Sequence, residues 1–128
     1  PYLTKDFFIE NLKYINLHIG KIPNYRGLKC IEWAILNNDY NSVGYTIHEM
    51  TSKLDFGSIY HYETIECVNK SLSEIYAECY IQGITNIVKT GLDKKRTVIK
   101  EPEACGKIYY SIDFITFIMN KVLKKIEV

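Results

Sequence analysis

Polar and apolar residues alternate with a period of two over residues 14–19, Tyr-Ile-Asn-Leu-His-Ile. A period of two is typical of a β-strand, in which successive side chains point to opposite faces. One face would carry three aliphatic residues, and the other would carry Tyr14, Asn16 and His18. We therefore expect a buried strand that presents Asn16 and His18 side by side.

The rest of the chain is predicted to alternate between helices and strands. Apolar spacing predicts helices over 3–13, 28–36 and 111–125, strands over 43–50 and 58–67, and a short extended piece at 97–99. Ser71 and Glu74 match a capping box, so a further helix is expected to begin there and to end near Gly91. Such alternation indicates the α/β class.

Composition narrows the range of functions. Apolar residues make up 47% and charged residues 24% of the 128 residues, which fits a single globular domain. The 16 basic residues nearly balance the 15 acidic ones, so we expect neither a nucleic-acid partner nor a membrane surface. The sequence contains no signal peptide and no apolar run of about 18 residues, and it predicts a cytoplasmic protein. Because the chain begins at Pro1 without an initiator Met, we interpret it as a piece of a longer protein.

The cysteines do not suggest a metal site. Cys30, Cys67, Cys79 and Cys105 are scattered, without a Cys-x-x-Cys pair and without a histidine at the spacing of metal ligands. We therefore expect free thiols in a reducing compartment, with neither a zinc site nor a disulfide framework.

Asn16 and His18 have the chemistry of a catalytic pair. If their strand belongs to an α/β sheet, its carboxyl end is where ligands bind. An asparagine amide can donate to a developing oxyanion, and a histidine can transfer a proton near neutral pH. Asp55, in the loop 51–57, could orient the imidazole. The alternative is that all three satisfy backbone groups or cap turns. His48 lies within the predicted strand 43–50, and we interpret it as a structural, hydrogen-bonded histidine.

Five short strings follow one another through the first half of the chain. They are Asn16-Leu17-His18, Ile22-Pro23-x-Tyr25-Arg26-Gly27, Trp33-Ala34-Ile35-x-Asn37, Gly44-x-Thr46-Ile47-His48-x-Met50 and Leu54-Asp55-x-Gly57-x-Ile59. In order and spacing they resemble the folate-dependent formyltransferase family, which includes methionyl-tRNA, glycinamide ribonucleotide and sugar N-formyltransferases. The resemblance covers about residues 3–65, is weaker after Ser71 and is faint beyond Leu92.

The resemblance implies a reaction and a set of residues. The acceptor amine attacks the formyl carbon of 10-formyltetrahydrofolate, with neither a metal nor a covalent enzyme intermediate. The catalytic group carries over to Asn16, His18 and Asp55: the first two stabilise the oxyanion, and Asp55 supports proton removal. The remaining site residues implied are Tyr25, Arg26 and Gly27 beside the acceptor and Leu54 and Gly57 beside the folate. Arg26 has two interpretations, contact with an acceptor phosphate or bracing of its own loop.

The loop after His18 favours one branch of the family. Many members have His-Pro-Ser-Leu-Leu-Pro where this chain has His18-Ile19-Gly20-Lys21-Ile22-Pro23. This loop is more similar to sugar N-formyltransferases, which implies that the acceptor is a nucleotide-linked amino sugar. Two alternatives share the catalytic group: a formyltetrahydrofolate hydrolase, which uses water as acceptor, and a methionyl-tRNA formyltransferase-like enzyme.

The resemblance also implies how the chain is organised. Residues 1–128 correspond to a single-domain fragment, the C-terminal half of a formyltransferase catalytic domain with a Rossmann-like mixed sheet and flanking helices. An alternative of another class is a non-catalytic fragment that needs a partner half to complete the sheet. Its sign would be an exposed apolar edge or face, which could also pair two copies into a homodimer.

Overall fold

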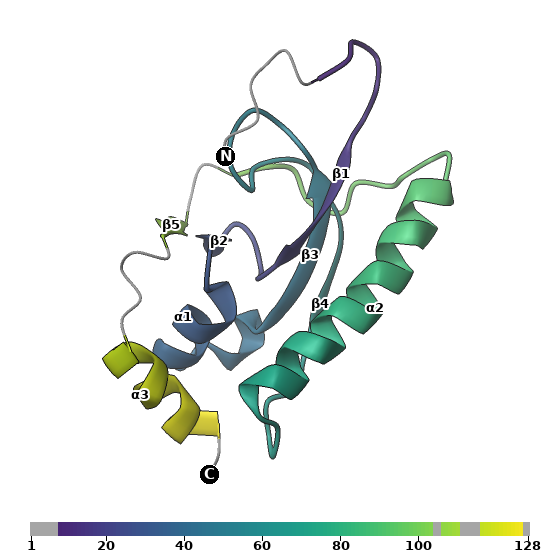
Figure 1. Cartoon of the computed structure of the whole chain (residues 1–128). Helices are drawn as coiled ribbons and strands as arrows, with labels where there is room; N and C mark the ends of the chain where they lie inside the picture. The colour runs from purple at the N-terminus through teal and green to yellow at the C-terminus, as the bar shows by residue number, and fades with distance from the viewer. Residues whose placement is uncertain (1–7, 104–105, 111–115, 127–128) are drawn as a thin grey trace.

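The computed structural model describes residues 8–103, 106–110 and 116–126. Within these ranges the main sheet has the strand order β1-β3-β4, and both of its strand pairs are antiparallel (Figure 1). The bounds of these strands are Ile15–Ile19 for β1, Gly44–Glu49 for β3 and Ile59–Thr64 for β4. A second, parallel pair joins β2 (Tyr25–Gly27) to β5 (Lys107–Tyr109).

In the described part of the chain, three α-helices flank the sheets. They are α1 (Cys30–Leu36), α2 (Leu72–Leu92) and α3 (Thr116–Ile126), with a short 3₁₀ helix, η2 (Tyr40–Ser42), after α1. The long α2 lies along one face of the main sheet, and α1 and α3 pack together near one end of α2 (Figure 1). The element types confirm the α/β class.

Helix α2 is held against the sheet by its start and by its middle. At its start the Ser71 side chain accepts from the Glu74 backbone N–H, and the Glu74 carboxylate accepts from the Ser71 N–H at 2.7 Å, which is the predicted capping box. In its middle Gly83 lies over Leu17 of β1. A Cβ at Gly83 would come within 2.6 Å of the Leu17 side chain. The glycine, which costs helix propensity, thus allows close packing of α2 on β1.

One hydrophobic core joins these elements. Its fully buried members come from α1, β3, α2 and α3: Ile31, Ile35, Tyr45, Ile47, Ile75, Cys79 and Val122. On β3 the residues facing α2 are buried completely, whereas the corresponding residues on β1 are only half-buried. The difference follows from the sheet order, because β3 is central and β1 is an outer strand among the described residues.

The structure also corrects the sequence prediction. Residues 8–13 form a bend and a turn, so the helix expected over 3–13 is wrong there, and residues 3–7 lie outside the described ranges. The polar residues between its apolar positions give no stable apolar stripe. Of the helix predicted over 111–125, residues 111–115 lie outside those ranges, and Val122 is buried as expected. Helix α2 continues through Gly91 to Leu92. No helix in the described part of the chain is long and apolar enough to cross a membrane.

The capping box makes a first prediction. Replacing Ser71 with alanine removes the side chain that accepts from the Glu74 N–H, and should lower the free energy of unfolding by about 1 kcal/mol. Ser71→Thr keeps the hydroxyl and should change it by less than about half of that. Urea unfolding followed by circular dichroism measures both variants. Equal destabilisation by alanine and threonine would show that the hydroxyl of Ser71 does not stabilise the start of α2.

Candidate active site

Asn16 and His18 share one face of β1, as predicted, and this face is turned away from α2, which packs on Leu17. Their strand is antiparallel to β3 and is an outer strand among the described residues, and His18 is the last residue but one of β1. Their register partners on β3 are His48 and Thr46, respectively. Because opposite residues of an antiparallel pair project from the same face, the four polar side chains form one cluster.

Asp55 completes this cluster from the loop between β3 and β4. Its Oδ2 accepts the Gly27 backbone N–H at 2.7 Å and lies 3.3 Å from Nδ1 of His18. The side chains of Asp55 and His18 are only 9% and 6% exposed. Asp55 has a positive φ of 43°, a left-handed conformation that aspartate tolerates better than most residues. The structure therefore brings Asn16, His18 and Asp55 together, as the sequence predicted.

Both nitrogens of His18 face acceptors. Nε2 lies 2.9 Å from the Tyr25 carbonyl oxygen, which can only accept, so this nitrogen carries a proton. Nδ1 faces the Asp55 carboxylate. Burial lowers the pKa of His18, and the positive charge of Arg26 lowers it further, while Asp55 and the Tyr25 carbonyl oppose the shift. A protonated His18 would therefore donate to the Tyr25 carbonyl oxygen and to Asp55, although the lowered pKa favours the neutral ring in the resting site.

Arg26 braces the Asp55 loop. Its Nε donates to the Leu54 carbonyl oxygen at 3.0 Å and to the Asp55 carbonyl oxygen at 3.2 Å. This geometry favours the bracing interpretation over contact with an acceptor phosphate. Gly57 closes the loop against β3, where a Cβ would lie 1.9 Å from the Glu49 carbonyl oxygen, so no larger residue fits without moving the backbone. Contact of Leu54 and Gly57 with folate, and of Tyr25, Arg26 and Gly27 with the acceptor, stays a prediction.

His48 belongs to the same cluster. Its Nε2 lies 3.3 Å from Nδ2 of Asn16 and 3.8 Å from Oδ1 of Asp55, and its side chain is 3% exposed. A signal for this neighbour is present in the sequence, since Thr46, His48 and Met50 alternate like the residues of β1. Only the strand register, however, places His48 directly opposite Asn16.

The described cysteines are not expected to act as nucleophiles. Cys30, Cys67 and Cys79 are free thiols, while Cys105 lies outside the described residues. Burial raises the pKa of Cys79 to about 12 and also raises that of Cys30, so neither is poised as a thiolate. Among the described residues no group of three or more His, Cys, Asp or Glu side chains is placed to hold a metal ion.

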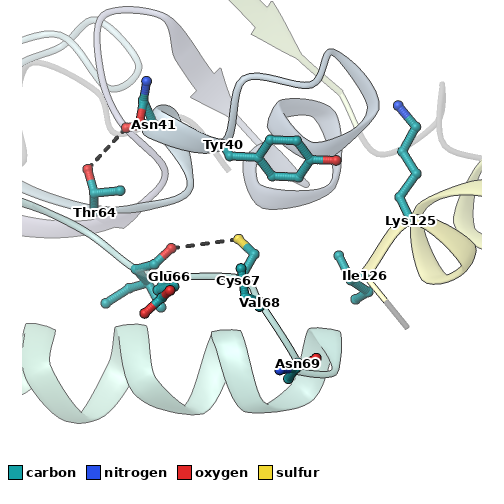
Figure 2. Close-up of a pocket in the computed structure, with 10 residues that line it drawn as sticks. Tyr40, Asn41, Thr64, Glu66, Cys67, Val68, Asn69, Lys125 and Ile126 are labelled. Carbon is teal, nitrogen blue, oxygen red and sulfur yellow. Dashed lines mark hydrogen bonds between the residues drawn. The ribbon is translucent and has the colours of Figure 1, made fainter. Parts of the chain in front are cut away.

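A pocket of about 480 Å³ lies away from the cluster. It is lined by Tyr40, Asn41, the segment 64–69, Lys125 and Ile126 (Figure 2). Nζ of Lys125 is bound to Oδ1 of Asn38 at 2.7 Å and to the Leu36 carbonyl oxygen at 3.1 Å, so this amine closes the end of α1. None of the three candidate catalytic residues lines this pocket, and we do not assign the active site to it.

An amide donor, a buried imidazole and a carboxylate within hydrogen-bonding reach have the chemistry for acid–base acyl transfer. Comparison with known families identifies the class. The family model described as "Formyl transferase" matches residues 3–85, which contain the whole cluster. The chain belongs to the formyl transferase family, whose members are folate-dependent enzymes.

Two curated relatives show the breadth of this similarity. The bifunctional polymyxin resistance protein ArnA of Wigglesworthia glossinidia brevipalpis is 35% identical over 90 residues, covering 65% of this chain and 14% of the relative. The methionyl-tRNA formyltransferase of Lactobacillus acidophilus is 32% identical over 88 residues, covering 68% of this chain and 28% of the relative. The chain thus spans less than a third of either relative.

Solved structures share the fold. A 4-N formyltransferase from Francisella tularensis superposes with a TM-score of 0.66 at 28% identity, covering 78% of this chain and 42% of that one. The formyltransferase PseJ from Anoxybacillus kamchatkensis, solved with UDP-4,6-dideoxy-4-formamido-L-AltNAc and tetrahydrofolate, gives a TM-score of 0.68 at 22% identity. PseJ covers 88% of this chain, and 64% of PseJ is covered in turn.

The environment of His18 makes a second prediction. Because burial is the dominant effect, its imidazole should titrate below the ordinary histidine pKa of about 6.5, and Asp55→Asn should lower the pKa further by removing the negative partner. Histidine NMR titration measures this shift. A His18 pKa at or above about 6.5 would contradict the assignment.

Proposed function

We propose that this chain supplies the catalytic group of an enzyme that transfers a formyl group from 10-formyltetrahydrofolate to an amine. The proposal is carried by one observation, the buried contact between His18 and Asp55 beside Asn16, within the residues matched by the family model. The donor is a second substrate, and the loop that holds Leu54 and Gly57 next to Asp55 is the part of this chain that would contact it.

The reaction can be written with these groups. The amine nitrogen attacks the formyl carbon, the C–N bond to N10 of the folate later breaks, and the formyl oxygen is negative in between. Asn16 donates an amide N–H to that oxygen, and His18, once protonated, stabilises it through its positive charge, because both ring nitrogens already face the Tyr25 carbonyl oxygen and Asp55. Asp55 balances the imidazolium and supports removal of the amine proton. N10 of the departing folate takes up a proton, so no net charge is left on the enzyme.

A nucleotide-linked amino sugar is the acceptor that we favour. The Francisella structure is a 4-N formyltransferase, and PseJ was solved with a nucleotide-linked formamido sugar. The segment 18–23, which differs from the usual family string, leads directly to Tyr25, whose carbonyl oxygen contacts His18. Because this segment begins at His18, its residues can determine which acceptor binds. The same cluster would serve a formyltetrahydrofolate hydrolase if water replaced the amine.

This function makes a third prediction, for the natural full-length protein. With 10-formyltetrahydrofolate and a panel of nucleotide-linked amino sugars, one acceptor should be formylated, and His18→Ala and Asp55→Asn should each lower kcat by at least about a hundredfold. Absorbance of the folate product measures the rate. Thr85→Ala, on the exposed side of α2, is the control and should leave kcat unchanged.

Three other outcomes of this assay are informative. Deformylation without any amine acceptor would establish the hydrolase instead. Formylation of methionyl-tRNA in place of the sugars would overturn the acceptor. Full activity in the His18 and Asp55 variants would overturn the catalytic assignment.

A second candidate, a fragment that needs a partner half, is favoured by one exposed flank of α2. The side chains of Ile81 and Leu92 are 69% and 78% exposed, and Tyr80, Ile84 and Val88 are also exposed. At 100° per residue these five lie on one flank of α2, on the side where Gly91 contacts Ile15 of β1. The opposite side of the helix carries the buried Ile75 and Cys79, together with Asn86, which is bonded to His61 of β4. The apolar flank therefore faces away from the sheet.

Among the described residues the outer edge of β1 is a second open surface. The Met50 N–H donates to the Tyr14 carbonyl oxygen, so even-numbered residues of β1 bond to β3 and odd-numbered ones point outward. A strand that paired with this edge, followed by a helix on the flank of α2, would cover both surfaces.

This flank makes a fourth prediction. The isolated 128-residue chain should self-associate as its concentration rises, and Ile84→Lys with Val88→Lys should shift it toward monomer by removing apolar contact area. Sedimentation velocity measures the state. Ser52→Lys adds a charge at an exposed position of the loop between β3 and β4, away from the apolar flank, and should leave the association unchanged. A monomer at every concentration would show that the apolar flank of α2 does not drive association.

A further inference from the structure

His48 contacts two members of the proposed catalytic group but is not itself one of the three. Its Nδ1 lies 2.8 Å from the Glu49 carbonyl oxygen, which can only accept, so Nδ1 carries the proton. In the neutral ring Nε2 is then a bare acceptor. This acceptor is directed at Nδ2 of Asn16, at 3.3 Å. The backbone of Glu49 thus sets the tautomer that Asn16 meets.

The surroundings of His48 keep this ring neutral. Burial lowers its pKa, and the nearby His18 lowers it further, while the Glu49 carbonyl and Asp55 oppose the shift. A protonated Nε2 would face the Asn16 amide nitrogen, where two donors would meet. The neutral form instead gives one clear hydrogen bond, with Asn16 donating and His48 accepting.

We propose that His48 is a positioning residue that fixes the orientation of the Asn16 amide, so that a side-chain N–H and not the carbonyl oxygen is offered to the formyl oxygen. The inference rests on the proposed formyl transfer. An asparagine amide has two N–H groups on one nitrogen: His48 takes one and leaves the other for the substrate. If the amide turned over, its oxygen would face the developing oxyanion and repel it.

The sheet supports this role by holding His48 in place. Asn16 and His48 are direct register partners, so their side chains leave the sheet side by side. The register between β3 and β4 shifts between Ile47 and His48. Such bulges re-aim side chains next to active sites. The extra residue is Tyr60 of β4, so the irregularity of this strand pair lies directly beside His48, the residue that contacts Asn16.

The test is a double-mutant cycle in the natural full-length protein. His48→Leu removes the acceptor, and we expect kcat for formyl transfer to fall by roughly tenfold to a hundredfold, with KM for 10-formyltetrahydrofolate changed by less than about twofold. His48→Gln can again present an oxygen to Asn16, and it should recover most of the loss. In an Asn16→Ala background His48→Leu should change kcat by less than about twofold, because the group it positions is gone.

His61→Leu is the matched control. This histidine lies on β4, half-exposed, and contacts Glu63 rather than the cluster, so kcat should not change. A full loss from His48→Leu that persists in the Asn16→Ala background would overturn the proposal, since His48 would then act independently of Asn16. Wild-type kcat in His48→Leu would overturn it as well.

A second measurement does not depend on activity or on the folding of a variant. Nitrogen-15 NMR of the wild-type imidazoles should show His48 neutral at pH 7 with its proton on Nδ1, and a coupling between the Asn16 amide and Nε2. A proton on Nε2 would overturn the proposed orientation. An inactive wild-type protein with this NMR signature would overturn the formyl transfer, and with it the catalytic purpose of the contact. The two failures are therefore distinguishable.

Discussion

The buried carboxylate of Asp55 is the contact on which the arrangement of the polar cluster depends. One oxygen accepts the backbone N–H of Gly27 and lies beside His18, so the carboxylate connects β1, β2 and the loop between β3 and β4. A buried charge without partners would be costly, and the N–H and the imidazole supply those partners. Arg26 holds the same loop by its carbonyl oxygens, at Leu54 and Asp55. The loop is therefore fixed through both its side chain and its backbone, and Asp55 cannot move away from His18 without losing both sets of bonds.

The register of β1 against β3 organises the remaining polar groups. Thr46, opposite His18, donates its hydroxyl to the Gly20 carbonyl oxygen at 2.8 Å and accepts the Ile22 N–H at 3.3 Å. These bonds hold the loop whose Tyr25 carbonyl oxygen faces His18. A slip of one residue would turn every polar side chain of β1 toward α2. The same register thus sets the apolar packing against α2 on one face of the sheet and the polar cluster on the other face. In this way the hydrophobic core positions the polar cluster without contacting it.

The features that were predicted correctly from the sequence are those that depend on a few neighbouring residues. The alternation of residues 14–19 predicted both faces of β1, and the capping box predicted the start of α2, because each depends on a few neighbouring residues. The contact of Asp55 with His18 was one of two interpretations of these residues, and only the family resemblance favoured it, since 37 positions separate them and no spacing rule reaches that far. His48 was interpreted as structural for the same reason: its hydrogen bonding is visible in the sequence as polarity, but its partner is set by strand register. The helix expected over 3–13 gave way to a turn over the described residues 8–13, where Asn11 adopts a positive φ of 67°.

The outer position of β1 ties the site to whatever completes the sheet. Asn16 and His18 stand on a strand whose odd-numbered backbone groups face outward and whose aliphatic side chains are only half-buried. The central strand β3, in contrast, buries its apolar residues completely. Pairing along the open edge would bury the aliphatic side chains of β1 and restrict fraying of the strand. Because the polar side chains lie on the same short strand, a neighbour on that edge would stiffen the catalytic geometry without contacting a reacting atom. The geometry of the Asn16, His18 and Asp55 cluster therefore depends on whether the open edge of β1 is paired.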